Sequence, residues 1–243
     1  MSTTDTNDTS DAGVGNTDKT GGPRSPRTTA GPGPDNRGGP PLALRASGAL
    51  LRWRTIDLLT CAFLGVAFGV AYWAWSLAYQ PPSTALATVF PPLQGITAAP
   101  WLMAGVVGGL VIRRPGAALF CELIAAVVEA LVGNVWGLST LWSGLLQGAG
   151  AELAFLILGY ASFGVGAAVL AGALSAPFEA VYEWYAYWTD WGMAYKVVYL
   201  LILTASGAVV AGGVGWLLTR GLARAGALGA FPPGQEQREA RAV

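Results

Sequence analysis

The sequence contains no histidine and only two lysines, Lys19 and Lys196, among its 243 residues. Without histidine, Ser-His-Asp and Cys-His catalytic arrangements and His-based zinc or haem sites are excluded. Neither lysine follows a glycine-rich loop, so the chain lacks a Walker A phosphate-binding motif. We therefore expect no catalytic residue, no metal, no cofactor and no ATPase activity of its own.

Cysteine is almost as rare. The two cysteines, Cys61 and Cys121, both lie inside apolar runs. Free cysteine packs as a small hydrophobic residue, and we expect that role for both. The sequence predicts no disulfide framework.

Charged residues are also scarce, at 12% of the chain, whereas 53% of the residues are hydrophobic. The mean hydropathy is +0.48. Soluble domains carry about a quarter charged residues, so the composition predicts a polytopic, all-α membrane protein in contact with a lipid bilayer. The formal net charge is zero, which gives no indication of a nucleic-acid partner.

Three parts of the chain differ in composition. Residues 1–47 are rich in Gly, Pro, Thr and Asp and bury too little apolar surface to fold, so we expect a disordered cytoplasmic tail. Residues 48–226 hold the apolar runs and form the expected transmembrane domain. Residues 227–243 are expected to be a short cytoplasmic C-terminal tail.

Six apolar runs approach the length of about 20 residues that a spanning helix needs. They cover residues 56–79, 95–112, 117–132, 138–158, 163–181 and 195–218. The third ends at the break Gly133-Asn134, and Pro177 weakens the end of the fifth. We predict six transmembrane helices, the third and fourth being antiparallel neighbours across a short turn.

The arginines indicate the orientation of these helices, because basic residues concentrate in short cytoplasmic loops. On a six-span arrangement the outer flanks hold Lys196 alone. The inner flanks hold Arg45, Arg52, Arg54, Arg113, Arg114, Arg220 and Arg224. The asymmetry predicts that both termini are cytoplasmic.

Three acidic residues lie within the apolar runs. They are Glu122, Glu129 and Glu152, with Asn134 and Gln147 nearby. Ionisable side chains inside a membrane cost about 2.5–3.5 kcal/mol on insertion scales, so they suggest function. For Glu122 and Glu152 the alternative is satisfaction within the bundle, by hydroxyls or by inward-reaching arginines. For Glu129, near the outer end of its helix, we favour contact with a ligand.

Aromatic residues accumulate at the predicted outer ends, notably near Trp136 and in the segment 183–191. Such residues also form interfacial belts in ordinary membrane proteins. A carboxylate framed by aromatic rings suits a cationic or protonatable heterocycle, through charge attraction, stacking and cation–π contact.

Two stripes of small residues follow the first helix. One contains Cys61, Gly65 and Gly69, and the other contains Ala67 and Ala71. Small residues at this spacing let helices approach closely.

The middle of the chain resembles the YkoE-type S component of energy-coupling-factor (ECF) transporters. The most specific motifs are RRPGAALFCELIAAVVEALVGNVWG at residues 113–137 and LLQGAGAELAF at residues 145–155. Residues 64–75 and 221–228 extend the likeness, which spans roughly residues 50–230.

The resemblance implies a six-helix subunit that captures a vitamin at the outer face and hydrolyses nothing itself. The implied ligand is thiamine or its hydroxymethylpyrimidine precursor. The implied partners are a membrane coupling subunit (T component) and ATPase subunits. A histidine that helps bind thiamine in another S-component branch has no counterpart here.

The resemblance also implies which residues form the binding site. The matching pocket residues are Glu129, Asn134, Trp136, Gln147, Tyr182 and Glu183, with Trp184 and Tyr187 expected in a lid. Glu122 and Glu152 complete the expected substrate-binding set. Ala67 and Ala71 match the stripe that docks the coupling subunit.

Two other functional classes compete with this interpretation. A stand-alone, proton-coupled secondary transporter for a small cationic metabolite would use Glu122 or Glu152 as a proton relay, but no internal inverted repeat is evident. An intramembrane enzyme would lack histidine and a paired aspartate motif, although Glu122 and Glu152 could share a proton.

Overall fold

The structure is a computed structural model that describes residues 44–46 and 48–242. The expected disordered tail, residues 1–47, therefore lies almost entirely outside the described residues. The ordered part belongs to one compact unit that extends from Pro41 to Val243.

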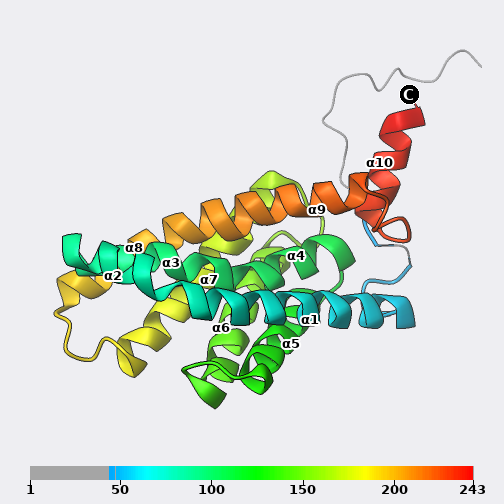
Figure 1. Cartoon of the computed structure of the whole chain (residues 1–243). Coiled ribbons are helices and arrows are strands. Elements are labelled where there is room, and N and C mark those ends of the chain that lie inside the picture. Colours follow the sequence, from blue (N-terminus) through cyan, green and yellow to red (C-terminus); the bar gives the residue numbers. More distant parts are fainter. Residues whose placement is uncertain (1–43, 47, 243) are drawn as a thin grey trace, which may run out of the picture. The chain divides into compact units, whose positions relative to one another are not determined.

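The described residues form helices and connecting turns, with no strand among them (Figure 1). In chain order the elements are α1 (Thr55–Ala78), α2 (Gln80–Val89), η1 (Pro91–Gln94), α3 (Gly95–Ala98), η2 (Ala99–Leu102), α4 (Met103–Ile112), α5 (Ala117–Val132), η3 (Gly137–Ser139), α6 (Thr140–Ile157), α7 (Val165–Ala186), α8 (Met193–Gly207), η4 (Ala208–Val214), α9 (Gly215–Arg224) and α10 (Pro232–Ala242).

Four helical segments are long and apolar enough to cross a membrane. They are Thr55–Ala78, Pro91–Ile112, Val165–Ala186 and Met193–Arg224. The second joins η1, α3, η2 and α4, and the fourth joins α8, the π-helical η4 and α9. The third and fourth predicted spans are α5, with 16 residues, and α6, whose 18 residues include Gln147 and Glu152.

Most predicted helix boundaries are confirmed to within a few residues, but two helices are longer than predicted: the last segment continues through α9 to Arg224, six residues beyond the predicted end at residue 218, and α7 is the second case. α7 continues through Pro177 to Ala186, five residues beyond the predicted end at residue 181. Glu183 therefore belongs to a helix rather than to a loop. The short helices α2 and α10 were not predicted, because neither is apolar along its length.

Glycines bring α1 against α5. A Cβ atom at Gly65 would lie 2.7 Å from Cβ of Ile124, and one at Gly69 would lie 2.6 Å from Cβ of Val128. The stripe of Cys61, Gly65 and Gly69 is therefore buried against α5, and both cysteines are buried and free, as predicted. α5 also packs against α4 and α6, which confirms that the third and fourth predicted helices are neighbours.

A second glycine contact joins α7 to the last long helix. A Cβ atom at Gly172 would collide with the carbonyl oxygen of Gly207, and one at Gly212 would lie 2.6 Å from Cα of Val169. Gly212 belongs to the π-helical segment η4. Backbone-to-backbone packing of this kind is typical of membrane helices.

The arginine-rich end of the bundle is tied together by ion pairs. Arg114, 1% exposed, donates from Nε to Oδ2 of the fully buried Asp57 at 2.7 Å. Arg54 pairs with the same carboxylate at 2.6 Å. Arg113 bonds Glu236 of α10 through both terminal nitrogens. This network joins the start of α1, the turn after α4 and the C-terminal helix.

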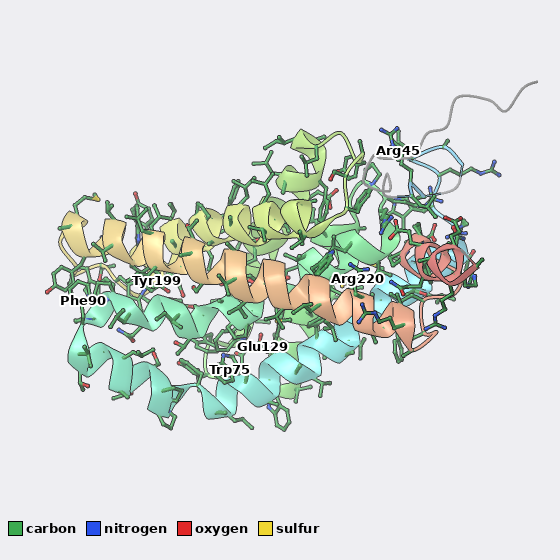
Figure 2. All side chains as sticks on the ribbon, turned by 90° about the horizontal axis from the view of Figure 1, so that it is seen from above. Arg45, Trp75, Phe90, Glu129, Tyr199 and Arg220 are labelled. Atoms are coloured by element: carbon green, nitrogen blue, oxygen red, sulfur yellow. The ribbon has the colours of Figure 1, made fainter. Side chains whose placement is uncertain are left out.

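The two ends of the bundle differ in residue type. Figure 2 shows Arg45 and Arg220 toward one end and Phe90 and Tyr199 toward the other. We call these the arginine end and the aromatic end.

Candidate functional site

A cavity of about 310 Å³ lies within the bundle, on the aromatic side of its centre. Its wall is built from α1, α2, α5, α6, α7 and α8, together with the helical segment 91–102 that precedes α4. Figure 2 shows Glu129, one of its wall residues, in the interior of the molecule. The volume lies in the range of pockets that hold small organic ligands.

Four carboxyl groups line this cavity, and no lysine or arginine does. Glu122 and Glu129 come from α5, whereas Glu179 and Glu183 come from α7. Members of the first pair are seven residues apart and members of the second are four apart, so each pair shares a helix face. The result is a strongly acidic cavity without a basic counter-charge in its wall.

Glu122 and Glu183 receive donors from the protein itself. Oε2 of Glu122 accepts the backbone N–H of Gly105 at 2.6 Å and the hydroxyl of Tyr72 at 3.5 Å. Glu183 accepts the hydroxyl of Tyr199. Glu122 thus has a hydroxyl partner inside the bundle, as the alternative for it requires, and it also lines the cavity, as the ligand-binding prediction requires. The arginines suggested for that role bind Asp57 and Glu236 instead.

Glu129 and Glu179 are only half satisfied. Oε1 of Glu129 accepts the indole N–H of Trp101 at 3.1 Å, and Oε1 of Glu179 accepts the hydroxyl of Ser143. The second oxygen of each, Oε2, is buried and accepts no hydrogen bond of normal geometry from the described residues. The nearest further hydrogen-bond partners are the amides of Asn134 for Glu129 and of Gln147 for Glu179, so each carboxyl has a second polar neighbour without a well-formed bond to it.

Three aromatic rings form one wall of the cavity. Tyr79, Trp101 and Trp136 lie in mutual contact, with ring centroids 5.3–5.4 Å apart. Because Trp101 also donates to Glu129, the rings stand next to a carboxylate. Tyr187, Trp188 and Tyr199 line the cavity from the α7–α8 side. Such surfaces stack on flat heterocycles and attract cations.

Six of the ten expected substrate-binding residues line the cavity. They are Glu122, Glu129, Trp136, Gln147, Glu183 and Tyr187. Gln147 is buried beside Glu179. The structure therefore brings residues from α5, the α5–α6 turn, α6 and α7 to one cavity.

Asn134, Tyr182 and Trp184 are not part of the cavity wall. Asn134 organises the α5–α6 turn: its amide donates to Thr140 at 2.8 Å, and its oxygen accepts the backbone N–H groups of Trp136 and Gly137. Tyr182 contacts the ring of Tyr187. Asn134 and Tyr182 thus support the neighbours that do reach the cavity.

Glu152 lies away from the cavity and binds the start of α5. Its carboxylate accepts backbone N–H groups of Gly116 at 2.6 Å, Ala118 at 2.9 Å and Leu119 at 3.3 Å. It also accepts the hydroxyl of Tyr160; burial and this bond raise the pKa of the Tyr160 phenol, which keeps it a donor. A carboxylate at a helix N-terminus stabilises the helix.

Several wall residues were missed by the sequence prediction. The most important are Tyr72, Tyr79, Trp101, Glu179 and Tyr199. Glu179 carried a detectable signal, since it precedes Glu183 by one helical turn in an apolar segment. Trp101 and Tyr199 carried none, because single aromatic residues occur throughout such helices.

The remaining expectations concern partners and metals. Ala67 and Ala71 are exposed on α1, on a different face from the stripe that packs on α5. The described residues contain no group of three or more His, Cys, Asp or Glu side chains that could hold a metal ion.

Comparison with known proteins identifies the family. The family model described as "ABC-type cobalt transport system, permease component" matches residues 56–178. YkoE of Bacillus subtilis (strain 168), described as an HMP/thiamine permease protein, is 30% identical over 195 residues, which cover 78% of this chain and 94% of the relative. A crystal structure of an S-component of an ECF transporter matches with a TM-score of 0.72 at 29% identity, covering 78% of this chain and 95% of that one. The chain therefore belongs to the YkoE-type S components of ECF transporters, which are multi-pass proteins of the plasma membrane.

Proposed function

We propose that this chain is the substrate-capture subunit of an ATP-driven ECF importer and that it binds thiamine or hydroxymethylpyrimidine from the outer face. The observation that carries the proposal is the acidic, aromatic-walled cavity, in which four carboxyl groups face no basic residue. Carboxyl groups in such a wall suit a ligand with positive charge and N–H donors. The relative described as an HMP/thiamine permease supports the same ligand class.

The proposal includes a membrane orientation. α5 and α6 join the four long segments to give six crossings, and both termini face the cytoplasm. The clustering of arginines where α1 begins and α4 and α9 end supports a cytoplasmic arginine end. The cavity, toward the aromatic end, then opens to the outside.

Coupling to ATP hydrolysis requires partners. Ala67 and Ala71 give α1 an exposed stripe of small residues that a helix of the membrane coupling subunit can approach closely. ATPase subunits bound to that partner supply the energy for transport.

Ligand binding tests the first step. The purified full-length chain contains ten tryptophans, three of which line the cavity, so its fluorescence should report occupancy. We expect thiamine and hydroxymethylpyrimidine to change the emission saturably, and Glu129→Gln to weaken binding by about tenfold or more, as loss of a charge-assisted hydrogen bond predicts. Binding of Co²⁺ without either organic ligand would contradict the proposal.

Transport tests the second step. In a host without its own thiamine uptake, radiolabelled ligand should accumulate only when the chain is co-expressed with a coupling subunit and ATPase subunits. Accumulation that follows the proton gradient in the absence of these partners would identify a secondary transporter instead.

A further inference from the structure

A second cavity, of about 390 Å³, lies at the arginine end and shares no wall residue with the acidic cavity. The segment before α1 forms most of its wall, and Arg114 enters from the turn after α4. Three arginines, Arg52, Arg54 and Arg114, line it, and no acidic side chain of the described residues does. This basic cavity has no role in the function proposed above.

The positive charge of this wall is only partly compensated. Asp57, which is fully buried and outside the wall, pairs with both Arg54 and Arg114. Arg52 is exposed and pairs with no carboxylate of the residues that the structure describes. Three guanidinium groups and one carboxylate leave a formal excess of two positive charges. The cavity therefore suits an anion, and guanidinium groups match the geometry of phosphate oxygens.

Contacts with neighbouring elements hold the wall in place. The guanidinium of Arg114 donates to the carbonyl of Ala49 at 3.0 Å, and the indole N–H of Trp53 donates to the carbonyl of Pro115 at 3.2 Å. Thr55, another wall residue, is the first residue of the 24-residue helix α1. The positive end of that helix dipole therefore adds to the attraction for an anion.

The surface next to the cavity favours a lipid as the source of the anion. An apolar stripe begins directly after Thr55, and its residues recur every three or four positions, so they share one face of α1. The stripe consists of Ile56, Leu59, Phe63, Val66 and Val70, all exposed. A phospholipid with its headgroup in the cavity can lay its acyl chains along this stripe, whereas a free phosphate ion uses none of it.

We propose that the basic cavity binds the phosphate group of an anionic phospholipid in the inner leaflet of the membrane. Basic pockets at the cytoplasmic ends of membrane helices suit such headgroups. Arg52 is the main contact, because Arg54 and Arg114 share their charge with Asp57. The assignment to the inner leaflet rests on the orientation proposed above, whereas the headgroup chemistry does not.

The first experiment changes the lipid and leaves the protein intact. Native mass spectrometry on the full-length chain in detergent compares the retention of phosphatidylglycerol and of phosphatidylcholine with identical acyl chains. We expect phosphatidylglycerol, which carries a net negative charge, to be retained at least about fivefold more strongly. Equal retention of the two lipids would overturn the proposal. Full displacement of phosphatidylglycerol by an equimolar amount of inorganic phosphate would overturn it too, since free phosphate would then be the ligand.

The second experiment changes the protein. Arg52→Gln removes a wall charge without breaking an ion pair of the described residues, and it should lower the retention of phosphatidylglycerol by about fivefold. The matched control is Arg220→Gln, which removes the same charge at the same end but outside the cavity (Figure 2). Screening should keep its effect within about twofold. Equal losses in the two variants would indicate a general attraction and would overturn the site.

A separate measurement tests the leaflet. Both native cysteines are buried, so Arg220→Cys places one exposed thiol at the arginine end. We expect a membrane-impermeant maleimide to leave this thiol unlabelled in intact cells. Labelling from outside would overturn both the inner-leaflet assignment and the proposed orientation. A chain that retains phosphatidylglycerol but binds neither thiamine nor hydroxymethylpyrimidine would refute the proposed function and support the lipid site.

Discussion

The arginine end and the cavity both bury charged side chains, but they satisfy them in opposite ways. At the arginine end, Arg114 and Asp57 are almost completely buried and bind each other, and Arg114 also donates to the carbonyl of Ala49 at 3.0 Å. In the cavity wall, four buried or half-buried carboxyl groups face no lysine or arginine, and Oε2 of Glu129 and of Glu179 is buried without a hydrogen bond of normal geometry from the described residues.

The difference distinguishes charged side chains that stabilise the fold from charged side chains that are available to a ligand. A buried ion pair with all its hydrogen bonds made is complete in the isolated protein, and removing one partner leaves the other uncompensated. An unpaired buried carboxylate costs stability in the empty protein and becomes favourable only when a donor arrives. Stability measurements with and without ligand can therefore distinguish the two regions.

The largest effect is expected at the arginine end. Arg114→Met removes the more deeply buried of the two arginines that pair with Asp57, while keeping much of the side-chain volume. We expect a loss of about 3 kcal/mol, the lower end of the range for broken buried pairs because Arg54 still compensates Asp57, seen as a lower melting midpoint and lower yield in detergent. Arg220→Met is the matched control, because Arg220 is exposed and its guanidinium lies over the ring of Trp216. A midpoint for Arg114→Met equal to that of the control would contradict a structural role for this pair.

Much of this architecture could be predicted from sequence, because apolar length and arginine placement are local properties of the chain. The six runs correspond to helices, α5 ends at Gly133 as the Gly-Asn break predicted, and Glu122 and Glu129 share a face of α5 that reaches the cavity. These features follow from helix periodicity and from the cost of burying charge.

The features that could not be predicted depend on the stagger of neighbouring helices, that is, on their relative positions along the bundle axis. The sequence prediction grouped Glu152 with Glu122 in one binding site, but Glu152 meets residues 116–119 at the start of α5, whereas Gly148 is the residue beside Glu122. Helix stagger is set by packing at glycines such as Gly148, which the pattern of a single helix does not contain. For the same reason the partners of Glu129 and Glu179, Trp101 and Ser143, were not identified from sequence.

A loss of stability of intermediate size is expected at Glu152. Like Glu129, this residue is an acid within an apolar run, but its contacts are different. Because its carboxylate accepts three backbone N–H groups and a tyrosine hydroxyl, Glu152→Gln should lower the melting midpoint, at a cost of about 1–3 kcal/mol. Ligand affinity measured well below that midpoint should stay within about threefold of wild type, since Glu152 touches nothing in the cavity wall. A variant with normal stability and abolished binding would show that the sequence-based assignment of Glu152 to the ligand was right.

The smallest expected change is a gain in the stability of the ligand-free protein, whereas the two changes above are losses. This opposite sign separates the cavity from the arginine end most sharply. Glu129→Gln combined with Glu179→Gln replaces two half-satisfied buried carboxylates by neutral amides. In the absence of ligand we expect a gain of about 1 kcal/mol, the usual trade between stability and function at a binding site. Ligand at 100 times its wild-type Kd should stabilise the wild type by about 2.7 kcal/mol, and the double variant by only about 0.4 kcal/mol if each substitution weakens binding tenfold.

The matched control for that experiment is Glu122→Gln combined with Glu183→Gln. It carries the same two substitutions in the same cavity, at carboxylates that already accept Gly105, Tyr72 and Tyr199. Among the described residues, neither Glu122 nor Glu183 has an oxygen that is both buried and without a hydrogen bond, so these amides relieve no such atom and the melting midpoint should not rise. If both double variants raise the midpoint equally, the buried unbonded oxygens of Glu129 and Glu179 are not what distinguishes them. The four acids would then differ only in position.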